Sequence, residues 1–418
     1  MRRLWAIFAL AVASILALTL LGCGASSTPA ATNSPAPPAA NPMPSPAPPP
    51  PPPPPPPSPA TTPSKFIYGV IGFEPEGNGP QAGQIDSSSG KISLVSGSPF
   101  DSGLGQSDVV QVLADPKGRF LYSLHQQASV GGMPLGESGI SEQKIDSQTG
   151  ALTANPPLVF SSAQDAPLAI DGLSRFLYHA NPAGFVTYAI DQNTGALTQA
   201  STSGTTIPRG TLCLTHNVAS LCIFLASSPD GKFLFSAGDG SIETLSINQQ
   251  TGELTAVPGA VMPTRGSSGP LAIEADGKFL YAGNAAEGTV AVFAVASSGM
   301  LTPVAGSPFK GETSAEFLAL TPNGQFLYAV SDMTNVVEGF RVNPKSGTFT
   351  SIGFSPISGT ALALDGSGKF AYIASAGLGT SPNFLGTFAI DPASGALTQV
   401  SSAPGPVIDN ADDLVTVP

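Results

Sequence analysis

The chain has 418 residues, of which 41% are hydrophobic and only 11% are charged. Its 28 acidic residues outnumber 16 basic ones, which gives a formal net charge of −12. A surface this acidic, with no basic stripe to offset it, repels nucleic acid, anionic lipid and phosphate-rich ligands, so we expect no nucleic-acid partner.

The first 23 residues indicate export. Arg2 and Arg3 precede an apolar run over residues 4–21, and Cys23 follows two residues after that run. This pattern resembles a bacterial lipoprotein signal peptide, whose cleavage leaves the cysteine as the lipidated N-terminus. The resemblance implies that Cys23 carries the lipid and anchors the protein to the bacterial membrane, and Gly24 favours the outer over the inner membrane. The alternative is an uncleaved transmembrane helix, because the run is nearly long enough to span a bilayer.

Residues 24–63 form a second region, rich in Ala, Ser, Thr and Pro, with ten uninterrupted prolines over 48–57. Proline fixes φ near the polyproline II value and donates no backbone hydrogen bond, so this region is predicted to be a disordered, extended spacer. Its reach is on the order of 100 Å if it is mostly extended. A partner that binds the proline-rich tract is the alternative function for this region.

Residues 64–418 contain a repeated phrase, a Phe followed by a hydrophobic and then an aromatic residue. Successive copies begin 54, 56, 57, 46, 47 and 44 residues apart. These spacings fit four short strands and their turns, and they are too long for leucine-rich or ankyrin repeats. The seven copies begin at Phe66, Phe120, Phe176, Phe233, Phe279, Phe326 and Phe370.

A second motif follows each phrase and predicts a hairpin turn. In six units an Asp or Asn precedes a Gly by four residues, and the fifth unit keeps only a degenerate form that ends at Gly299. The Asx side chain can accept hydrogen bonds from its own turn, and Gly supplies the positive φ that closes it. We therefore assign a structural role, and not a catalytic one, to Asp86, Asp146, Asp191, Asn248, Asn343 and Asp391.

Apolar stretches that end in Gly-bearing turns precede most Phe phrases, as in Pro270–Ile273 before Asp276-Gly277. Each unit is thus predicted to be a meander of four antiparallel strands, and the whole to be an all-β propeller with seven blades. The first unit lacks such a stretch, and the chain ends on one, Asp413–Pro418. We predict that this C-terminal strand completes the first blade and closes the ring.

The insertion before the fourth blade contains Cys213 and Cys222, the two cysteines that remain beside Cys23. In an oxidising compartment such a pair predicts a disulfide. The alternative is a metal site in which His216 joins the two thiols, although three ligands in one loop fall below the usual closed zinc set. No cofactor is predicted.

Acidic residues stand at the expected starts of several inner strands, which converge on one mouth of a propeller channel. Carboxylates from different blades could bind a hard cation or a cationic ligand there, and solvated loop acids are the alternative. The candidates are Asp108, Asp165, Glu316, Asp412 and Asp413. The longer insertions Ser129–Gly139 and Ser201–Ser220 are predicted to contribute a ligand- or partner-binding face beside them.

The phrase (Asp/Asn)-Gly-Lys-Phe-Leu-Tyr, followed by the Asx-Gly hairpin, resembles the seven-bladed lactonase-type propellers. These include bacterial 6-phosphogluconolactonases and fungal muconate lactonising enzymes, and the resemblance covers residues 64–418. It implies a lactone hydrolase, a carboxylic ester hydrolase. Catalytic members carry Pro-Arg-His ahead of an inner strand and Asn-Glu after a Phe-Leu-Tyr phrase.

This chain reads Pro270-Leu271-Ala272 and Asn284-Ala285 at those two places. His125, Asn181 and Asn284 follow aromatic phrases in equivalent positions and are expected to be satisfied strand-end groups. No catalytic residue is therefore assigned. We expect a monomeric, non-catalytic binding module in the periplasm or at the cell surface, with a cell-envelope protein or carbohydrate as ligand. The alternative is a lactone hydrolase with a rearranged site.

Overall fold

The computed structural model describes the chain from residue 63 onward, with gaps. All described residues belong to one compact unit over Pro56–Pro418. Residues 1–62, which hold the expected signal, Cys23 and most of the spacer, lie outside the described part. The described residues are 63–71, 79–105, 107–130, 133–160, 167–181, 184–203, 212–215, 218–221, 224–238, 240–264, 269–284, 286–311, 315, 317–331, 334, 336–357, 359–375, 384–401 and 411–418.

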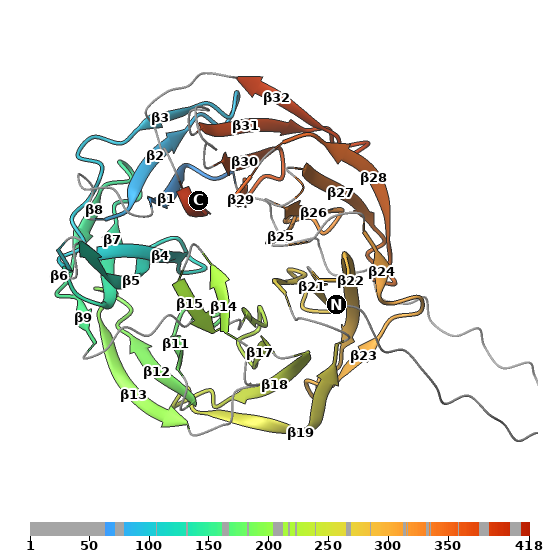
Figure 1. The fold of residues 1–418 in the computed structure, drawn as a ribbon, viewed down its shortest axis with the longest axis horizontal. Helices are drawn as coiled ribbons and strands as arrows, with labels where there is room; N and C mark the ends of the chain where they lie inside the picture. The colour runs from blue at the N-terminus through green and yellow to red at the C-terminus, as the bar shows by residue number, and fades with distance from the viewer. Residues whose placement is uncertain are drawn as a thin grey trace, which may run out of the picture. The chain divides into compact units, whose positions relative to one another are not determined.

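The described residues form strands and turns without a helix, and the strands assemble into seven antiparallel sheets placed around a circle (Figure 1). The predicted fold class, a seven-bladed propeller of four-stranded blades, is confirmed. The first three blades, each from its inner to its outer strand, are as follows. Blade one contains β33 (Ala411–Val417), β1 (Phe66–Ile71), β2 (Gln81–Ile85) and β3 (Ile92–Leu94). Blade two contains β4 (Ser107–Ala114), β5 (Phe120–Val130), β7 (Gly139–Ile145) and β8 (Leu152–Ala154), with β6 (Met133–Leu135) paired to β5 and β9 (Leu158–Val159) paired to β7. Blade three contains β10 (Leu168–Ile170), β11 (Phe176–Asn181), β12 (Gly184–Ile190) and β13 (Leu197–Ser203).

The remaining four blades keep the same order. Blade four contains β16 (Phe224–Ser227), β17 (Phe233–Gly238), β18 (Ser241–Ile247) and β19 (Leu254–Pro263). Blade five contains β20 (Leu271–Ile273), β21 (Phe279–Asn284), β22 (Thr289–Val295) and β23 (Leu301–Pro303), with β24 (Phe309–Lys310) paired to β22. Blade six contains β25 (Phe317–Leu320), β26 (Phe326–Ser331), β27 (Val336–Val342) and β28 (Phe349–Ser355). Blade seven contains β29 (Ala361–Leu364), β30 (Phe370–Ser375), β31 (Phe384–Ile390) and β32 (Leu397–Ser401). A separate hairpin, β14 (Leu212–Thr215) with β15 (Val218–Leu221), lies in the insertion between blades three and four.

The C-terminal strand closes the ring as predicted. β33 pairs with β1 from Phe66 opposite Val417 to Val70 opposite Asp413, and the Lys65 amide donates to the Val417 carbonyl at 2.8 Å. Two side chains of β33, Leu414 and Val417, are buried. The last strand therefore supplies both backbone pairing and core to the first blade.

The two repeated motifs meet across blade boundaries. The turn glycine of each blade packs on the leading Phe of the blade before it, so that Gly150 lies on Phe66 and Gly90 of blade one lies on Phe370 of blade seven. A Cβ on Gly150 would lie 2.4 Å from the Phe66 ring, and Gly150 has a φ of 72°, so no other residue fits without a shift. The same contact recurs at all seven boundaries, which explains why both motifs repeat together.

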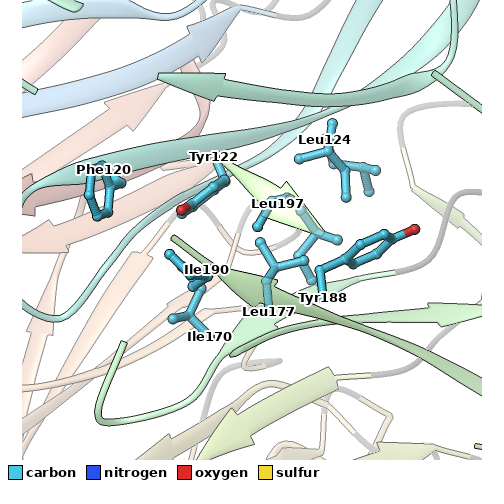
Figure 2. Close-up of a cluster of buried hydrophobic side chains, with 10 residues drawn as sticks. Phe120, Tyr122, Leu124, Ile170, Leu177, Tyr188, Ile190 and Leu197 are labelled. Atoms are coloured by element: carbon cyan, nitrogen blue, oxygen red, sulfur yellow. The ribbon is translucent and has the colours of Figure 1, made fainter. Parts of the chain in front are cut away.

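The core lies between the blades, where the Phe and Tyr of each phrase point to one face of their sheet, as expected from their spacing. The cluster between blades two and three illustrates this arrangement (Figure 2). Phe120 and Tyr122 of β5 face Leu177 of β11 and Ile190 of β12. Each blade is therefore held by both neighbours, and this fixes the inner strands around one axis.

The turn aspartates have the structural role assigned to them. Asp86 accepts hydrogen bonds from the backbone amides of Ser88 and Ser89, and these bonds and the bonds from the two serine hydroxyls lower its pKa to about 2. Asp146, Asp191 and Asp391 accept the same pair of amides in their own turns, and their pKa values are lowered for the same reason.

Candidate functional site

The inner strands all begin at the same end of the ring, where each second strand ends. Pairing places Leu168 opposite His179 in blade three, and Leu271 opposite Ala282 in blade five. Neighbouring inner strands run side by side, since the Gln111 side chain bonds both backbone groups of Leu168 and the Ser227 hydroxyl donates to the Ile170 carbonyl. We call this end of the ring the mouth. It is formed by the starts of inner strands and the ends of second strands.

One hydrogen-bonded chain of side chains reaches into the mouth. Ser107 begins inner strand β4 and is partly exposed, and its Oγ lies 2.9 Å from Nδ1 of His125 in the middle of β5. Nε2 of His125 lies 3.2 Å from Oγ of Ser141 on β7, which is fully buried. When Nε2 carries the proton and donates to Ser141, Nδ1 accepts the Ser107 hydroxyl proton.

Burial determines the charge state of His125. The side chain is 2% exposed, and desolvation lowers its pKa to about 3. The imidazole is therefore neutral at physiological pH. It can hold the Ser107 hydroxyl in one orientation, and it is a poor acceptor of a full proton.

The other polar residues after the aromatic phrases serve their own hairpins or neighbouring blades. Oδ1 of Asn284, which is 6% exposed, accepts the Glu287 amide at 3.2 Å in the turn that follows β21. His179 stacks on Phe160 of blade two at 4.9 Å between ring centres. Asn181 is the last residue of β11 and also has an interaction partner. The expectation that Asn284 is a satisfied strand-end group is confirmed.

The predicted acidic constellation falls mostly outside the described residues. Asp165 and Glu316 lie outside them, and Asp108 and Asp412 are placed on β4 and β33 without their side chains being described. Asp413 is described, and its carboxylate accepts the Val112 amide of β4 at 3.0 Å and its neighbour Leu414 at 2.9 Å. In the described part of the chain no three His, Cys, Asp or Glu side chains gather in a way that could hold a metal ion. Asp413 thus links the inner strands of blades one and two, and binding of a cation stays a prediction.

Blade five carries apolar residues at the positions where catalytic lactonase-type propellers are expected to carry Arg and His. Leu271 is the first residue of β20 and is partly exposed, and Ala272 follows it. Both are therefore at the mouth without charge, and Asn284 bonds within its own turn.

Two further predictions lie outside the described residues. Cys222 and His216 fall in the gaps, and the side chain of Cys213 on β14 is not described, so the disulfide and its metal alternative remain predictions. Among the described residues no helix has the length and apolar character needed to cross a membrane.

Sequence reasoning missed Ser107, Ser141 and Gln111. Ser107 precedes an apolar strand and resembles an ordinary turn residue, and its contact with His125 depends on the pairing register of β4 with β5. A bulge between Val109 and Gln111 sets that register, and no sequence signal predicted it.

Comparison with known proteins agrees with this geometry. Residues 225–361 match the family model described as lactonase, 7-bladed beta-propeller. No curated protein matches the chain in sequence. The resemblance to the lactonase-type propellers is thus confirmed for blades four to six, and it extends through the fold to the whole ring.

Solved structures share this fold at low identity. A putative 6-phosphogluconolactonase from Bacteroides fragilis is 20% identical, with a TM-score of 0.68 over 86% of this chain and 99% of that one. One from Bacteroides uniformis is 18% identical, with a TM-score of 0.68 over 85% of this chain and 100% of that one. The periplasmic gluconolactonase PpgL of Pseudomonas aeruginosa is 21% identical, with a TM-score of 0.67 over 84% of this chain and 99% of that one. These likenesses show a lactonase-type propeller fold.

Proposed function

We propose that this propeller binds a lactone at the mouth and hydrolyses it with a site rearranged from the one that the resemblance implied. The observation that carries the proposal is the Ser107–His125 hydrogen bond of 2.9 Å at the start of β4. The match to the lactonase family model and the structural neighbours named as lactonases support the same reaction class. The lactone hydrolase, which the sequence supported only as the alternative, is thus the preferred function, and the non-catalytic binding module is the second candidate.

Lactone hydrolysis requires a water molecule that is oriented toward the carbonyl carbon. Water attacks the lactone carbonyl carbon, the ring C–O bond breaks, and the departing oxygen takes a proton to give a hydroxy acid. Once the Ser107 proton is directed at Nδ1 of His125, the Ser107 lone pairs are free to accept a hydrogen bond from that water and aim it. Ser107 would touch the reacting water, and His125 would act through Ser107 as a positioning residue.

The proposal predicts an unusual pH dependence. Because the pKa of His125 is about 3, the imidazole does not change its charge between pH 5 and 8. The profile of kcat/KM should therefore show no histidine limb in that range. A limb near pH 6.5 that disappears in His125→Asn would contradict a neutral positioning role.

Turnover of a panel of γ- and δ-lactones, followed by pH-stat, tests the reaction directly. We expect wild type to hydrolyse at least one member above background, and Ser107→Ala to lower kcat/KM by at least about tenfold. Ser93→Ala, an exposed serine on outer strand β3, is the matched control and should match wild type. Turnover that Ser107→Ala leaves unchanged would reject the rearranged site.

A non-catalytic binding module is the second candidate, and a specific observation favours it. Leu271 and Ala272 supply no charge at the mouth, and the carboxyl group that would stabilise an imidazolium is missing from the two hydrogen bonds of His125. A lactone or carbohydrate that binds saturably without turnover across the panel would favour this candidate over the hydrolase.

We also propose that the protein is exported and anchored through a lipid on Cys23, with the spacer over residues 24–63 holding the ring away from the membrane. The arrangement of the signal, the cysteine and the proline run supports this. Wild type should fractionate with membranes and carry an acylated N-terminus by mass spectrometry, and Cys23→Ala should lose the acyl mass. The same spectra without reductant would show whether Cys213 and Cys222 are bridged.

A further inference from the structure

A group of polar side chains is buried in the boundary between blades one and two. This boundary is otherwise apolar, and Leu121 of β5 and Ile145 of β7 pack there in one cluster with Tyr68 of blade one. Alternate residues of a strand point to the same face of a sheet, so four polar residues of β5 and β7 share this face. They are Ser123, His125, Ser141 and Gln143, and each is at most 2% exposed.

Two of these four residues keep a polar atom without a partner. Oγ of Ser123 and Oε1 of Gln143 are buried and make no hydrogen bond within the described part of the chain. The orientation of the Gln143 amide is unambiguous, because Nε2 donates to the Asp101 carbonyl at 3.0 Å and a carbonyl oxygen can only accept. Oε1 of Gln143 is therefore a buried acceptor that lacks a donor.

Both unpartnered atoms belong to neighbours of Ser141. The pairing of β5 with β7 places Ser123 directly opposite Ser141, and Gln143 follows Ser141 by two residues on the same face. Side chains that are paired in this way have Cβ atoms about 5 Å apart, a separation that an ordered water molecule can bridge. Buried waters in proteins bind to two to four polar atoms that would otherwise be unsatisfied, and the side chains of Ser123, Ser141 and Gln143 supply such atoms.

The direction of the hydrogen bonds around His125 depends on what Ser141 bonds next. Oγ of Ser141 lies 3.2 Å from Nε2 of His125, and Oγ of Ser107 lies 2.9 Å from Nδ1. A hydroxyl can donate or accept, so the two serines alone permit either ring nitrogen to carry the proton. An acceptor beyond Ser141 favours one of the two arrangements, because it draws the Ser141 proton away from the imidazole.

We propose that one water molecule bound by Ser123, Ser141 and Gln143 extends the Ser107–His125 chain, and that Gln143 thereby sets the tautomer of His125. The water donates to Oε1 of Gln143 and accepts the hydroxyl proton of Ser141. Oγ of Ser141 then accepts the proton on Nε2 of His125, which leaves Nδ1 to accept the Ser107 hydroxyl proton.

Gln143 is thus a positioning residue, which acts on Ser107 through the water, Ser141 and His125. The water site and the tautomer do not depend on any reaction. Their effect on turnover rests on the proposed function, because only there does the orientation of the Ser107 hydroxyl matter.

The ¹⁵N resonances of the imidazole ring report the tautomer directly, since an unprotonated ring nitrogen resonates far downfield of a protonated one. The chain has three histidines, and the signals that disappear in His125→Asn are those of His125. In wild type at pH 7 we expect Nε2 to be protonated and Nδ1 to be unprotonated. Gln143→Met keeps the length of the side chain and removes the acceptor, so the two His125 signals should move toward each other as the second tautomer becomes populated.

Matched variants separate this effect from a general loss of packing. Ser123→Ala removes one partner of the water and should shift the His125 signals in the same direction by a smaller amount. Ser236→Ala removes a fully buried, unpartnered hydroxyl at the same position of blade four and should leave them unchanged. Gln249→Met removes a glutamine that donates to carbonyls beside its own turn, and it should also leave them unchanged.

Turnover of the lactone panel connects the tautomer to the reaction. Gln143→Met should lower kcat by at least about threefold and change KM little, because it disorders the Ser107 hydroxyl without removing a contact to the lactone. A shift of the His125 signals in Gln143→Met, when wild type hydrolyses no lactone, would support the inference and overturn the proposed hydrolysis.

Three results would overturn the inference and leave lactone hydrolysis standing. They are a proton on Nδ1 of His125 in wild type, unchanged His125 signals in Gln143→Met, and an equal shift in Ser236→Ala. If Gln143→Met does not fold, the shift in Ser123→Ala decides in its place. A crystal structure of the ring that resolves ordered waters should show one between Ser123, Ser141 and Gln143, and apolar contact without a water there would also overturn the inference.

Discussion

Two boundaries between blades are held together by different interactions. One lies between blades two and three, and the other lies between blades five and six. At the first, the Tyr122 hydroxyl donates to the Gly195 carbonyl at 2.8 Å, and Glu142 accepts the Leu197 amide at 3.0 Å. At the second, the Tyr281 hydroxyl turns back to Glu274 of its own blade at 2.8 Å. One boundary is joined by buried polar groups and the other is packed by aromatic rings.

The difference follows from two changes in the repeat. Blade five has Glu274 where Asp115 and Asp171 accept backbone amides in the first turn, and the longer side chain reaches the Tyr281 hydroxyl. Blade six has Phe349 at the start of its outer strand, where blades two, three, four, five and seven have Leu. The Phe349 ring lies 4.7 Å from Phe340, 4.8 Å from Phe309 and 6.4 Å from Tyr281. A repeat motif thus fixes the geometry of a boundary and leaves its chemistry free to vary.

Removal of residues 412–418 should have the largest effect, because it removes most of strand β33, whereas each other variant changes a single side chain. It takes away the pairing of β33 with β1, the buried Leu414 and Val417, and the bond from the Thr416 hydroxyl to the Leu364 carbonyl. We expect the cooperative thermal transition to be lost and the protein to associate through the exposed edge of β1. Circular dichroism and size-exclusion chromatography measure both effects. Removal of the exposed Pro418 alone is the control, and a shorter protein that melts and elutes like the full one would contradict closure.

Phe349→Ala should be next, because it empties the ring cluster between blades five and six. Truncation of a buried Phe costs about 3 to 5 kcal/mol. Phe349→Leu restores the residue used in five other blades and should cost less than half as much. Denaturant titration of both variants compares them, and equal losses would mean that the aromatic contacts add nothing.

Tyr281→Phe and Tyr122→Phe separate the two boundaries by pH. Tyr122→Phe removes one hydrogen bond and should cost about 1 kcal/mol at any pH from 5 to 8. Blade four already has Phe235 at this position, so the packing tolerates the change. Tyr281→Phe leaves Glu274 buried without its donor, and since burial raises the Glu274 pKa to about 7, the loss should be larger at pH 8 than at pH 5. Melting curves at pH 5 and pH 8 measure the stability lost in each variant. An identical dependence on pH in the two variants would contradict this difference between the boundaries.

Glu142→Gln should give the smallest effect. Burial raises the pKa of Glu142 to about 7, although the Leu197 amide opposes the shift. The folded state therefore holds a proton that the unfolded state has released, so the stability contributed by protonated Glu142 is complete below pH 4.5 and is lost as pH rises toward 7. The glutamine cannot ionise, and it should raise Tm at pH 8 by on the order of 2 °C and change it little at pH 4.5. Glu253→Gln, at an exposed turn position, is the control. A Tm gain of equal size at both pH values would exclude this linkage.

The seven-bladed ring could be predicted from the sequence, and the residues of the candidate site could not. The reason is physical. The Phe phrase and the Asx-Gly turn are local patterns, and both were assigned correctly to strand and hairpin. That Gly150 rests on Phe66 of another blade depends on packing between distant segments, and no local pattern encodes it. The same holds for Ser107 and His125, which meet only because a bulge in β4 shifts its register against β5. Asp413 shows the reverse case, in which a conspicuous residue was singled out as a ligand and its carboxylate is occupied by backbone amides.

The most direct test of the functional account is a crystal structure of the ring with δ-valerolactam, an analogue whose amide resists hydrolysis. The account predicts the lactam carbonyl beside Ser107 at the start of β4. Density for the analogue outside the mouth, or an empty mouth at saturating concentration, would contradict it.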